Sequence, residues 1–409
     1  MKRLSASETN IDQNIINRRF VFLLVSRAAR STALIFANLS IPLYLLAIHY
    51  SIVSIGIIYI FVALATTGVS LFIGLLGDRI GFRKAMIIGE IPALFLTSVL
   101  FLTTDHSLII VGIVLSGSAG AAGGLRGAFS PGINAYIATN WPDTGERVRR
   151  MALVTSIASA FSIAGSLMLY FYDFVERSYG EIGAFRILYF VCFLLVLISF
   201  ISLFFLKERK TEKKTNRVMN RQSSLYTIRV LVSNAINGSG LGLSIVLLPA
   251  WFELRYGIDT SEVGLVFLFS YLGTSIGSLV ASRMKNNMIS ARPRTLRTAS
   301  YTRIIQGLLM VVVAVSPLLP VAAVLYAARS FVAGIGAPNR TTVNVSGISS
   351  GDYGAATSLQ GVSSRVSQSF SGLSGYLMDV SLPLPLVAGG ILQSISGAVY
   401  YKLLKQKNS

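Results

Sequence analysis

Charged residues are scarce in this chain, and cysteine and histidine are almost absent. Only 13% of the residues are charged and 53% are hydrophobic, whereas about 25% of an average soluble protein is charged. A soluble protein of this size needs a polar shell that such a composition does not supply. The one cysteine, Cys192, has no partner for an internal disulfide. The composition therefore excludes a disulfide framework and favours a membrane protein.

Apolar runs that could cross a membrane recur along the whole chain. About 20 helical residues cross ~30 Å of hydrocarbon. No short apolar stretch with a cleavage site comes before the first run, so that helix is expected to act as the insertion signal. Twelve spans are predicted, at 20–48, 51–76, 85–103, 108–137, 151–172, 184–206, 228–252, 262–282, 301–317, 320–344, 354–378 and 384–404.

Lysine and arginine concentrate in alternate connections between these spans, above all in KERKTEKKTNRVMNR at 207–221. The other connections are richer in acids, among them Asp173, Glu176, Glu253 and Asp259. By the positive-inside rule, both termini should be cytoplasmic, and we expect a plasma-membrane protein. The net charge of +19 would then face anionic lipid headgroups. No soluble domain remains that could bind nucleic acid, so none is expected as a partner.

The longest polar stretch divides the spans six and six. Short repeats support a division there. GAFSPGIN at 127–134 in the fourth span resembles GIGAPNRT at 334–341 in the tenth, which is the corresponding span of the second half. We predict an all-α membrane protein of two pseudo-symmetric six-helix bundles. Its parts would be a cytoplasmic tail, an N-terminal bundle, a cytoplasmic linker, a C-terminal bundle and a second tail, at 1–19, 20–206, 207–227, 228–404 and 405–409.

The connection after the second span carries the most specific motif, GLLGDRIGFRK at 74–84. It resembles the signature of the major facilitator superfamily, a loop between helices two and three with a glycine, an acid–arginine pair, a second glycine and a basic cluster. The resemblance implies a twelve-helix transporter that works by alternating access, with this loop in a cytoplasmic gate. The expected gating residues are Gly74, Gly77, Asp78, Arg79, Gly81, Arg83 and Lys84.

Asp78 would stand at the cytoplasmic end of the second helix. There it could accept hydrogen bonds from the exposed amides that begin another helix and gain from that helix's dipole. The resemblance makes this the eleventh helix, which begins near Tyr353. The alternative is a solvated loop acid. A nucleotide-binding loop is not supported, because no Gly-Lys-Ser/Thr follows the glycines.

Several arginines fall inside the predicted spans, where a charge is costly and often functional. Arg30 and Arg365 fall near the midplane by helical rise, whereas Glu90 is the only acid clearly inside a span. Most of this positive charge is therefore expected to lack a protein counter-ion, and arginine suits carboxylate or phosphate. Alternatively, these side chains bond helix-end carbonyls or extend to the interface. The candidate substrate-binding residues are Arg30, Arg365, Arg329, Arg126, Asn38, Asn134, Asn237 and Gln368.

These features together predict a secondary transporter of a small organic anion. Glu90 is the candidate proton carrier, with a salt-bridged structural acid as the alternative. Drug antiporters of the superfamily usually have Gly-Pro and Gly-Gly in the fifth helix, where this chain has only Gly165 and no proline. Efflux of amphiphilic drugs or metabolites, transport of sugars or other neutral solutes, and a membrane-embedded sensor or enzyme remain alternatives.

An enzyme would need a nucleophile–base pair or a set of metal ligands, and the sequence has no His/Cys/Asp cluster of such spacing. We therefore expect no catalytic residues, no metal and no cofactor. No ATP-binding signature is present, so any energy for transport would come from a gradient, with a proton or another ion as the coupling ion. The expected partners are the substrate and the lipid bilayer, and the expected oligomeric state is a monomer.

Overall fold

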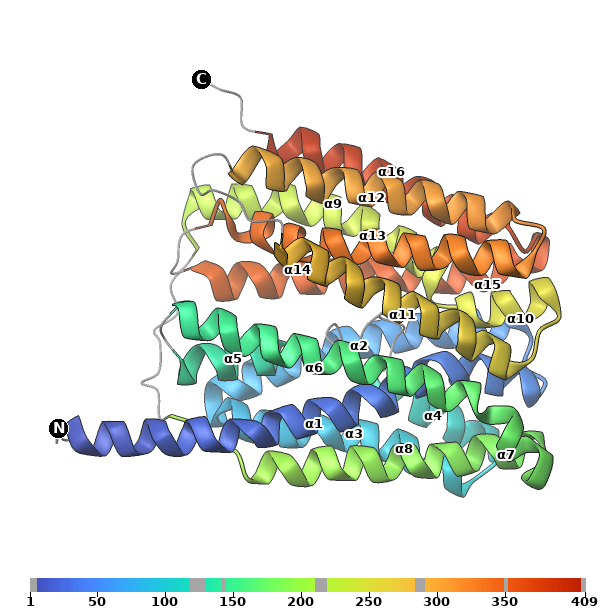
Figure 1. Cartoon of the computed structure of the whole chain (residues 1–409), viewed down its shortest axis with the longest axis horizontal. Coiled ribbons are helices and arrows are strands. Elements are labelled where there is room, and N and C mark those ends of the chain that lie inside the picture. Colours follow the sequence, from blue (N-terminus) through green and yellow to red (C-terminus); the bar gives the residue numbers. More distant parts are fainter. Residues whose placement is uncertain are drawn as a thin grey trace.

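The chain folds into a bundle of long helices (Figure 1). The computed structural model describes residues 6–117, 130–141, 144–209, 219–283, 291–348 and 352–405. In these ranges all regular secondary structure is helical. That agrees with the apolar composition, because a helix satisfies every backbone polar group within its own segment.

The first half contains eight helices in the described ranges. They are α1 (Ala6–Ala47), α2 (Ile52–Ile80), α3 (Phe82–Leu102), α4 (His106–Ser116), α5 (Ser130–Asn140), α6 (Thr144–Tyr170), α7 (Tyr172–Tyr179) and α8 (Glu181–Phe204). Polar caps begin two of them. The Ser51 hydroxyl accepts from an amide of α2 at 3.2 Å, and the Asp105 carboxylate accepts from an amide of α4 at 2.8 Å.

The second half has the same kind of segments. They are α9 (Arg221–Ile245), α10 (Leu248–Tyr256), α11 (Thr260–Arg283), α12 (Ala291–Val315), α13 (Leu319–Val345), α14 (Tyr353–Ser367), the 3₁₀ turn η2 (Gln368–Phe370), α15 (Ser371–Val380) and α16 (Leu384–Leu404).

Ten helical stretches in the described residues are long and apolar enough to cross a membrane. The remaining two predicted spans are divided. The span at 108–137 consists of α4 and α5 on either side of residues outside the description, and the span at 354–378 consists of α14, η2 and α15 in succession. The predicted twelve-span, all-helical fold class is confirmed.

Several helices begin before their predicted spans, and α1 and α9 are two examples. Helix α1 begins at Ala6 rather than near residue 20. Helix α9 begins at Arg221, inside the predicted linker at 207–227, and the Asn220 side chain accepts from the amide of Gln222 at its start. Both differences have one cause: polar residues extend these helices beyond the apolar run, so hydropathy marks the span and not the helix end.

The two halves repeat one packing pattern. In the first half, α1 packs against α6 and α8, and α3 packs against α8. In the second half, α9 packs against α14 and α16, and α12 packs against α16. Helices α1 to α8 lie on one side of the bundle and α9 to α16 on the other (Figure 1). Both termini lie at one end of the bundle, here called the terminal side, and α7 and α10 lie at the opposite side.

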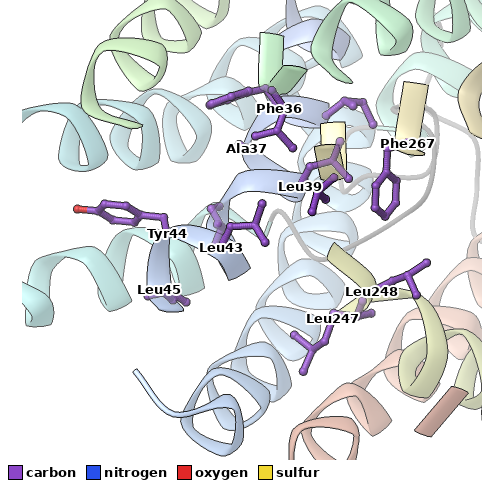
Figure 2. Packing of buried hydrophobic residues seen from close by; sticks show 14 of the residues in the cluster. Phe36, Ala37, Leu39, Leu43, Tyr44, Leu45, Leu247, Leu248 and Phe267 are labelled. Carbon is purple, nitrogen blue, oxygen red and sulfur yellow. The ribbon is translucent and has the colours of Figure 1, made fainter. Parts of the chain in front are cut away.

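The described buried apolar residues form three clusters, of which one contains residues of both halves and two contain residues of one half each. The largest one joins the two halves at the opposite side, where Figure 2 shows Leu39 and Leu43 of α1 near Leu247, Leu248 and Phe267 of the second half. The other two clusters lie toward the terminal side. One contains residues of the first half and the other residues of the second half. The described apolar core therefore connects the halves at the opposite side.

Candidate functional site

Arg30 and Glu90 form a buried ion pair between α1 and α3. Arg30 is 6% exposed and Glu90 is fully buried, and Arg30 Nη1 donates to Glu90 Oε2. The Ser199 hydroxyl of α8 donates to Glu90 Oε1 at 2.6 Å and lies 2.8 Å from the hydroxyl of Ser26. Arg30 therefore has an acid partner inside its own half.

Arg303 of α12 is a buried residue that the sequence analysis did not select. Its Nη1 donates to the hydroxyls of Ser233 at 2.9 Å and Ser396 at 3.1 Å, and its Nη2 donates to Asn234 Oδ1 at 2.7 Å. The guanidinium also lies 4.4 Å from the centre of the Tyr400 ring, within the range of a cation–π interaction. Arg303 thus joins α12 to α9 and α16. Because Arg303 lies within the predicted span at 301–317, its charge at membrane depth could have identified it as a candidate from the sequence.

Arg329 of α13 is also inside the second half. It is 4% exposed, and its Nη2 donates to Gln393 Oε1 of α16 at 2.9 Å. Gln393 Nε2 donates to the Ser244 hydroxyl of α9 at 2.8 Å, and that hydroxyl donates to the Gly240 carbonyl at 2.7 Å. This chain of bonds fixes the orientation of the Gln393 amide and ties α13 to α9 and α16. Gln393 is a second polar residue that the sequence analysis missed.

Arg365 and Gln368 are half-buried and lie on one face of the eleventh span. Gly361, Arg365, Gln368 and Gly372 follow at three- and four-residue spacing, which keeps them on that face. At the opposite-side end, a Cβ placed on Gly56 of α2 would lie 2.8 Å from the Gly372 carbonyl oxygen. At Gly361, a Cβ would meet only Arg365 Nη1, at 3.9 Å, in the described chain. This face therefore touches α2 near Gly372, whereas near Gly361 the described residues leave room for at least a methyl group.

The remaining candidate polar residues are less closely defined. Asn38 on α1 is half-buried, and its Oδ1 has no hydrogen-bond partner in the described chain. Asn237 on α9 is also half-buried. Asn134 belongs to α5, but its side chain lies outside the described part, and Arg126 lies wholly outside the described residues.

The signature motif at 74–84, expected as a loop, instead covers the end of α2, the connecting Gly81 and the start of α3. Helix α2 ends at Ile80, and Gly81 follows with a φ of 96°, a left-handed conformation that favours glycine. The Glu208 carboxylate, just after α8, accepts from the amides of Phe82 and Arg83 at 2.9 Å each. Arg83 Nη2 donates to the Phe204 carbonyl at 2.6 Å. Glu208 thus caps α3, a contact that the sequence analysis did not foresee.

The other members of the motif lie on or beside the same connection. Gly77 is buried, and a Cβ there would overlap the Phe82 ring. Arg79 and Lys84 are exposed. Gly74 and Asp78 belong to α2, but the surroundings of their side chains lie outside the described part. The expected contact of Asp78 with α14 therefore stays a prediction.

Direct contacts join the halves at the opposite side. Glycines allow α2 and α15 to approach closely, since a Cβ on Gly56 would lie 3.1 Å from Gly375 Cα. Helices α6 and α11 also meet, because a Cβ on Gly264 would lie 2.5 Å from the Tyr170 nitrogen. The amide of Asp173 donates to the Ser261 hydroxyl at 3.0 Å. With the shared apolar cluster, these contacts close the opposite side.

The sequence profile of the Major Facilitator Superfamily matches residues 21–372, which is most of the chain. The chain belongs to this superfamily. It is therefore a multi-pass membrane transporter. The sequence matches none of the curated proteins with which it was compared.

Solved structures with a similar fold belong to transporters of different substrates. A human organic anion transporter, MFSD10 (TETRAN), is similar with a TM-score of 0.67 and 13% identity over 95% of this chain and 99% of that one. An auto-inhibited POT family peptide transporter has a TM-score of 0.73 and 13% identity over 96% and 98%. The nucleoside transporter NupG has a TM-score of 0.67 and 11% identity over 94% and 98%. At such identities the likeness shows the fold and does not determine the substrate.

Proposed function

We propose that this superfamily member transports a small organic anion across the plasma membrane by alternating access. The first support is the balance of buried charge. In the described spans one acid, Glu90, is buried, against Arg27, Arg30, Arg303, Arg329 and Arg340, each at most 9% exposed. An interior with excess positive charge disfavours cationic cargo and favours an anion.

Arg365 carries the proposal. It is half-buried on the face of α14 where, among the described residues, a Cβ on Gly361 would meet only Arg365, and Gln368 follows one turn later. A carboxylate or phosphate approaching this face would meet a guanidinium that binds with two parallel hydrogen bonds. One charge-assisted hydrogen bond contributes about 1.5–3 kcal/mol, which corresponds to roughly ten- to a hundred-fold in affinity.

The role proposed for Arg30 differs from that of Arg365. The Arg30 guanidinium binds Glu90, and Ser199 holds the same carboxylate. Removing one partner of a buried ion pair costs about 3–5 kcal/mol, so using Arg30 to bind substrate, or Glu90 to carry a proton, would require breaking this pair. We therefore assign Arg30 and Glu90 a structural role and Arg365 the contact with substrate.

The conformation supports alternating access with the terminal side in the cytoplasm, where the lysine- and arginine-rich connections belong. In this proposal, the contacts that join the halves at the opposite side belong to an inward-facing state. In the outward-facing state, the signature loop and the start of α14 would close the terminal side. A substrate bound near Arg365 would thus reach the cytoplasm from the state described here.

A thermal-shift screen of the purified transporter against metabolite carboxylates and phosphates tests the proposal, because a ligand of the folded state raises its stability. Arg365→Gln should abolish the shift produced by the best anion, and Arg365→Lys should reduce it. Arg229→Gln is the matched control, since Arg229 lies on the exposed face of α9 with Leu225 and Val232. Uptake of that anion into proteoliposomes should fall in parallel. Normal binding and uptake by Arg365→Gln would overturn the organic-anion proposal.

A further inference from the structure

Carboxylates of both halves gather where the opposite side is closed. Asp173 of α7 and Glu181 of α8 belong to the first half, and Glu253 of α10 and Asp259 before α11 to the second. Glu181 and Asp259 lie within electrostatic range of Glu253, and Asp173, Glu181 and Asp259 lie within electrostatic range of Glu176. Closing this side therefore brings like charges together from the two halves.

Two of these carboxylates are also partly removed from water. Asp173 Oδ1 and Glu253 Oε2 are buried and have no hydrogen-bond partner in the described chain. The backbone amide of Asp173 donates a hydrogen bond to the Ser261 hydroxyl of α11 at 3.0 Å. Asp173 therefore lies at the contact between the halves. A carboxylate that loses water without gaining a partner is strongly destabilised in its charged form.

Nearby groups do not neutralise Glu253. No arginine or lysine of the described residues forms an ion pair with it, and Arg255 on its own helix is exposed. The Tyr172 hydroxyl donates to the Glu181 carbonyl at 2.9 Å. Other titratable or charged groups on the surrounding elements include Glu176, exposed Arg177 and buried Tyr44 of α1, the helix that packs against α10. They also include Arg186 bonded to the Phe101 and Leu102 carbonyls, Tyr256 bonded to the Ser316 carbonyl, and Glu262 bonded to the Asp259 amide.

We propose that the contact between the halves at the opposite side is a proton-sensitive gate, closed fully when Glu253 is protonated. In the open state, the Glu253 carboxylate is hydrated and ionised. On closure, protonation of Glu253 removes its repulsion from Glu181 and Asp259. It also removes the free-energy cost of burying a charged carboxylate oxygen that has no hydrogen-bond partner in the described chain. Acid on this side therefore stabilises the closed, inward-facing state, and alkaline conditions favour its opening. The inference concerns the gate and does not depend on which substrate is carried.

The test uses a single cysteine whose reactivity reports opening. Leu247 is fully buried in the apolar cluster that joins the halves, so Leu247→Cys in a Cys192→Ser background should react with a maleimide when this side opens. Ser178→Cys, on the exposed part of α7, corrects for the reagent's own pH dependence. The corrected labelling rate should fall about ten-fold between about pH 8 and about pH 5.5.

Charge-removing variants identify the responsible group. Glu253→Gln should label slowly at every pH, as if permanently protonated, and Asp173→Asn should reduce the pH dependence. Asp379→Asn is the control, because Asp379 is an exposed acid at the same side of the bundle, and it should behave like the parent. The proposal is overturned if the parent's corrected rate is independent of pH, or if Glu253→Gln and Asp173→Asn both keep the parent's pH dependence. Substrate-free protein is used throughout, so failure of the organic-anion proposal would not alter these results.

Discussion

Glu90 and Arg303 occupy corresponding places in the two halves and carry opposite charges. Glu90 lies on the third span and bonds to α1 and α8, the first and sixth spans of its half. Arg303 lies on the ninth span and bonds to α9 and α16, which are the first and sixth spans of the second half. One polar residue thus ties the same three helices in each half, although its chemistry differs.

The Arg303 contacts predict a large loss of stability on a conservative change. Arg303→Lys keeps the charge but cannot reach Ser233, Ser396 and Asn234 together from one ammonium, so buried polar groups lose their partners. Each such group costs about 1–3 kcal/mol. Thermal unfolding of the purified variant should show a melting temperature several degrees lower. Arg294→Lys, at an exposed position of the same helix, should unfold like the parent, and equal stability of the two variants would contradict the role given to Arg303.

The sequence predicted much of the fold because apolar runs and loop charges are local signals. Each span is recognised from its own residues, so the order of twelve spans did not depend on tertiary contacts. The seventh span is a further divided one, because α9 ends at Ile245 and α10 begins at Leu248. Pro249 near the start of α10 was a local signal of that break, since proline cannot continue the preceding backbone hydrogen bonds.

The polar interior was harder to predict because its partners are distant in the sequence. Glu90 is 60 residues from Arg30, and Ser233 and Ser396 are 70 and 93 residues from Arg303. Hydropathy locates an arginine within a span, but it does not fix the rotation of that helix against its neighbours. For this reason Arg30 could be selected as buried and polar without its pairing with Glu90, and Arg303 was not selected.

The Arg30–Glu90 pair can be tested by a double-mutant cycle. Glu90→Gln and Arg30→Met should each destabilise the transporter by about 3–5 kcal/mol, because each leaves a buried partner behind. The double variant should lose less than the sum, and the difference measures the coupling of the two residues. Stability from denaturant or thermal unfolding provides the values. Full stability of Glu90→Gln together with lost pH-driven transport would instead support Glu90 as a proton carrier.

The close contact of α2 with α15 predicts a variant that cannot close the opposite side. Gly56→Leu would place side-chain atoms against the Gly372 carbonyl and Gly375, and this overlap opposes only the closed arrangement of the halves. Gly68→Leu is a matched control on the same helix, because a Cβ there meets no atom of the described residues within 4 Å. Labelling of Leu247→Cys should increase with Gly56→Leu and stay unchanged with Gly68→Leu. Equal labelling of the two would mean that the glycine contact does not hold the gate.

Asp78 should stabilise the state in which the terminal side is closed. Helix α14 begins at Tyr353, and its first amides would offer hydrogen bonds and a favourable dipole to an approaching carboxylate. Asp78→Asn keeps the shape and removes the charge, at a cost of about 0.5–2 kcal/mol in that one state. Because the proposed inward-facing state would not need this contact, its population should rise by a few-fold or more. Transport should fall at normal expression, and labelling of Leu247→Cys should also fall, since the opposite side then stays closed for longer. Arg79→Gln is the control, because Arg79 is an exposed neighbour in the last turn of α2 and its loss tests a general change of charge at this helix end. Unchanged labelling in Asp78→Asn would leave Asp78 as a solvated acid.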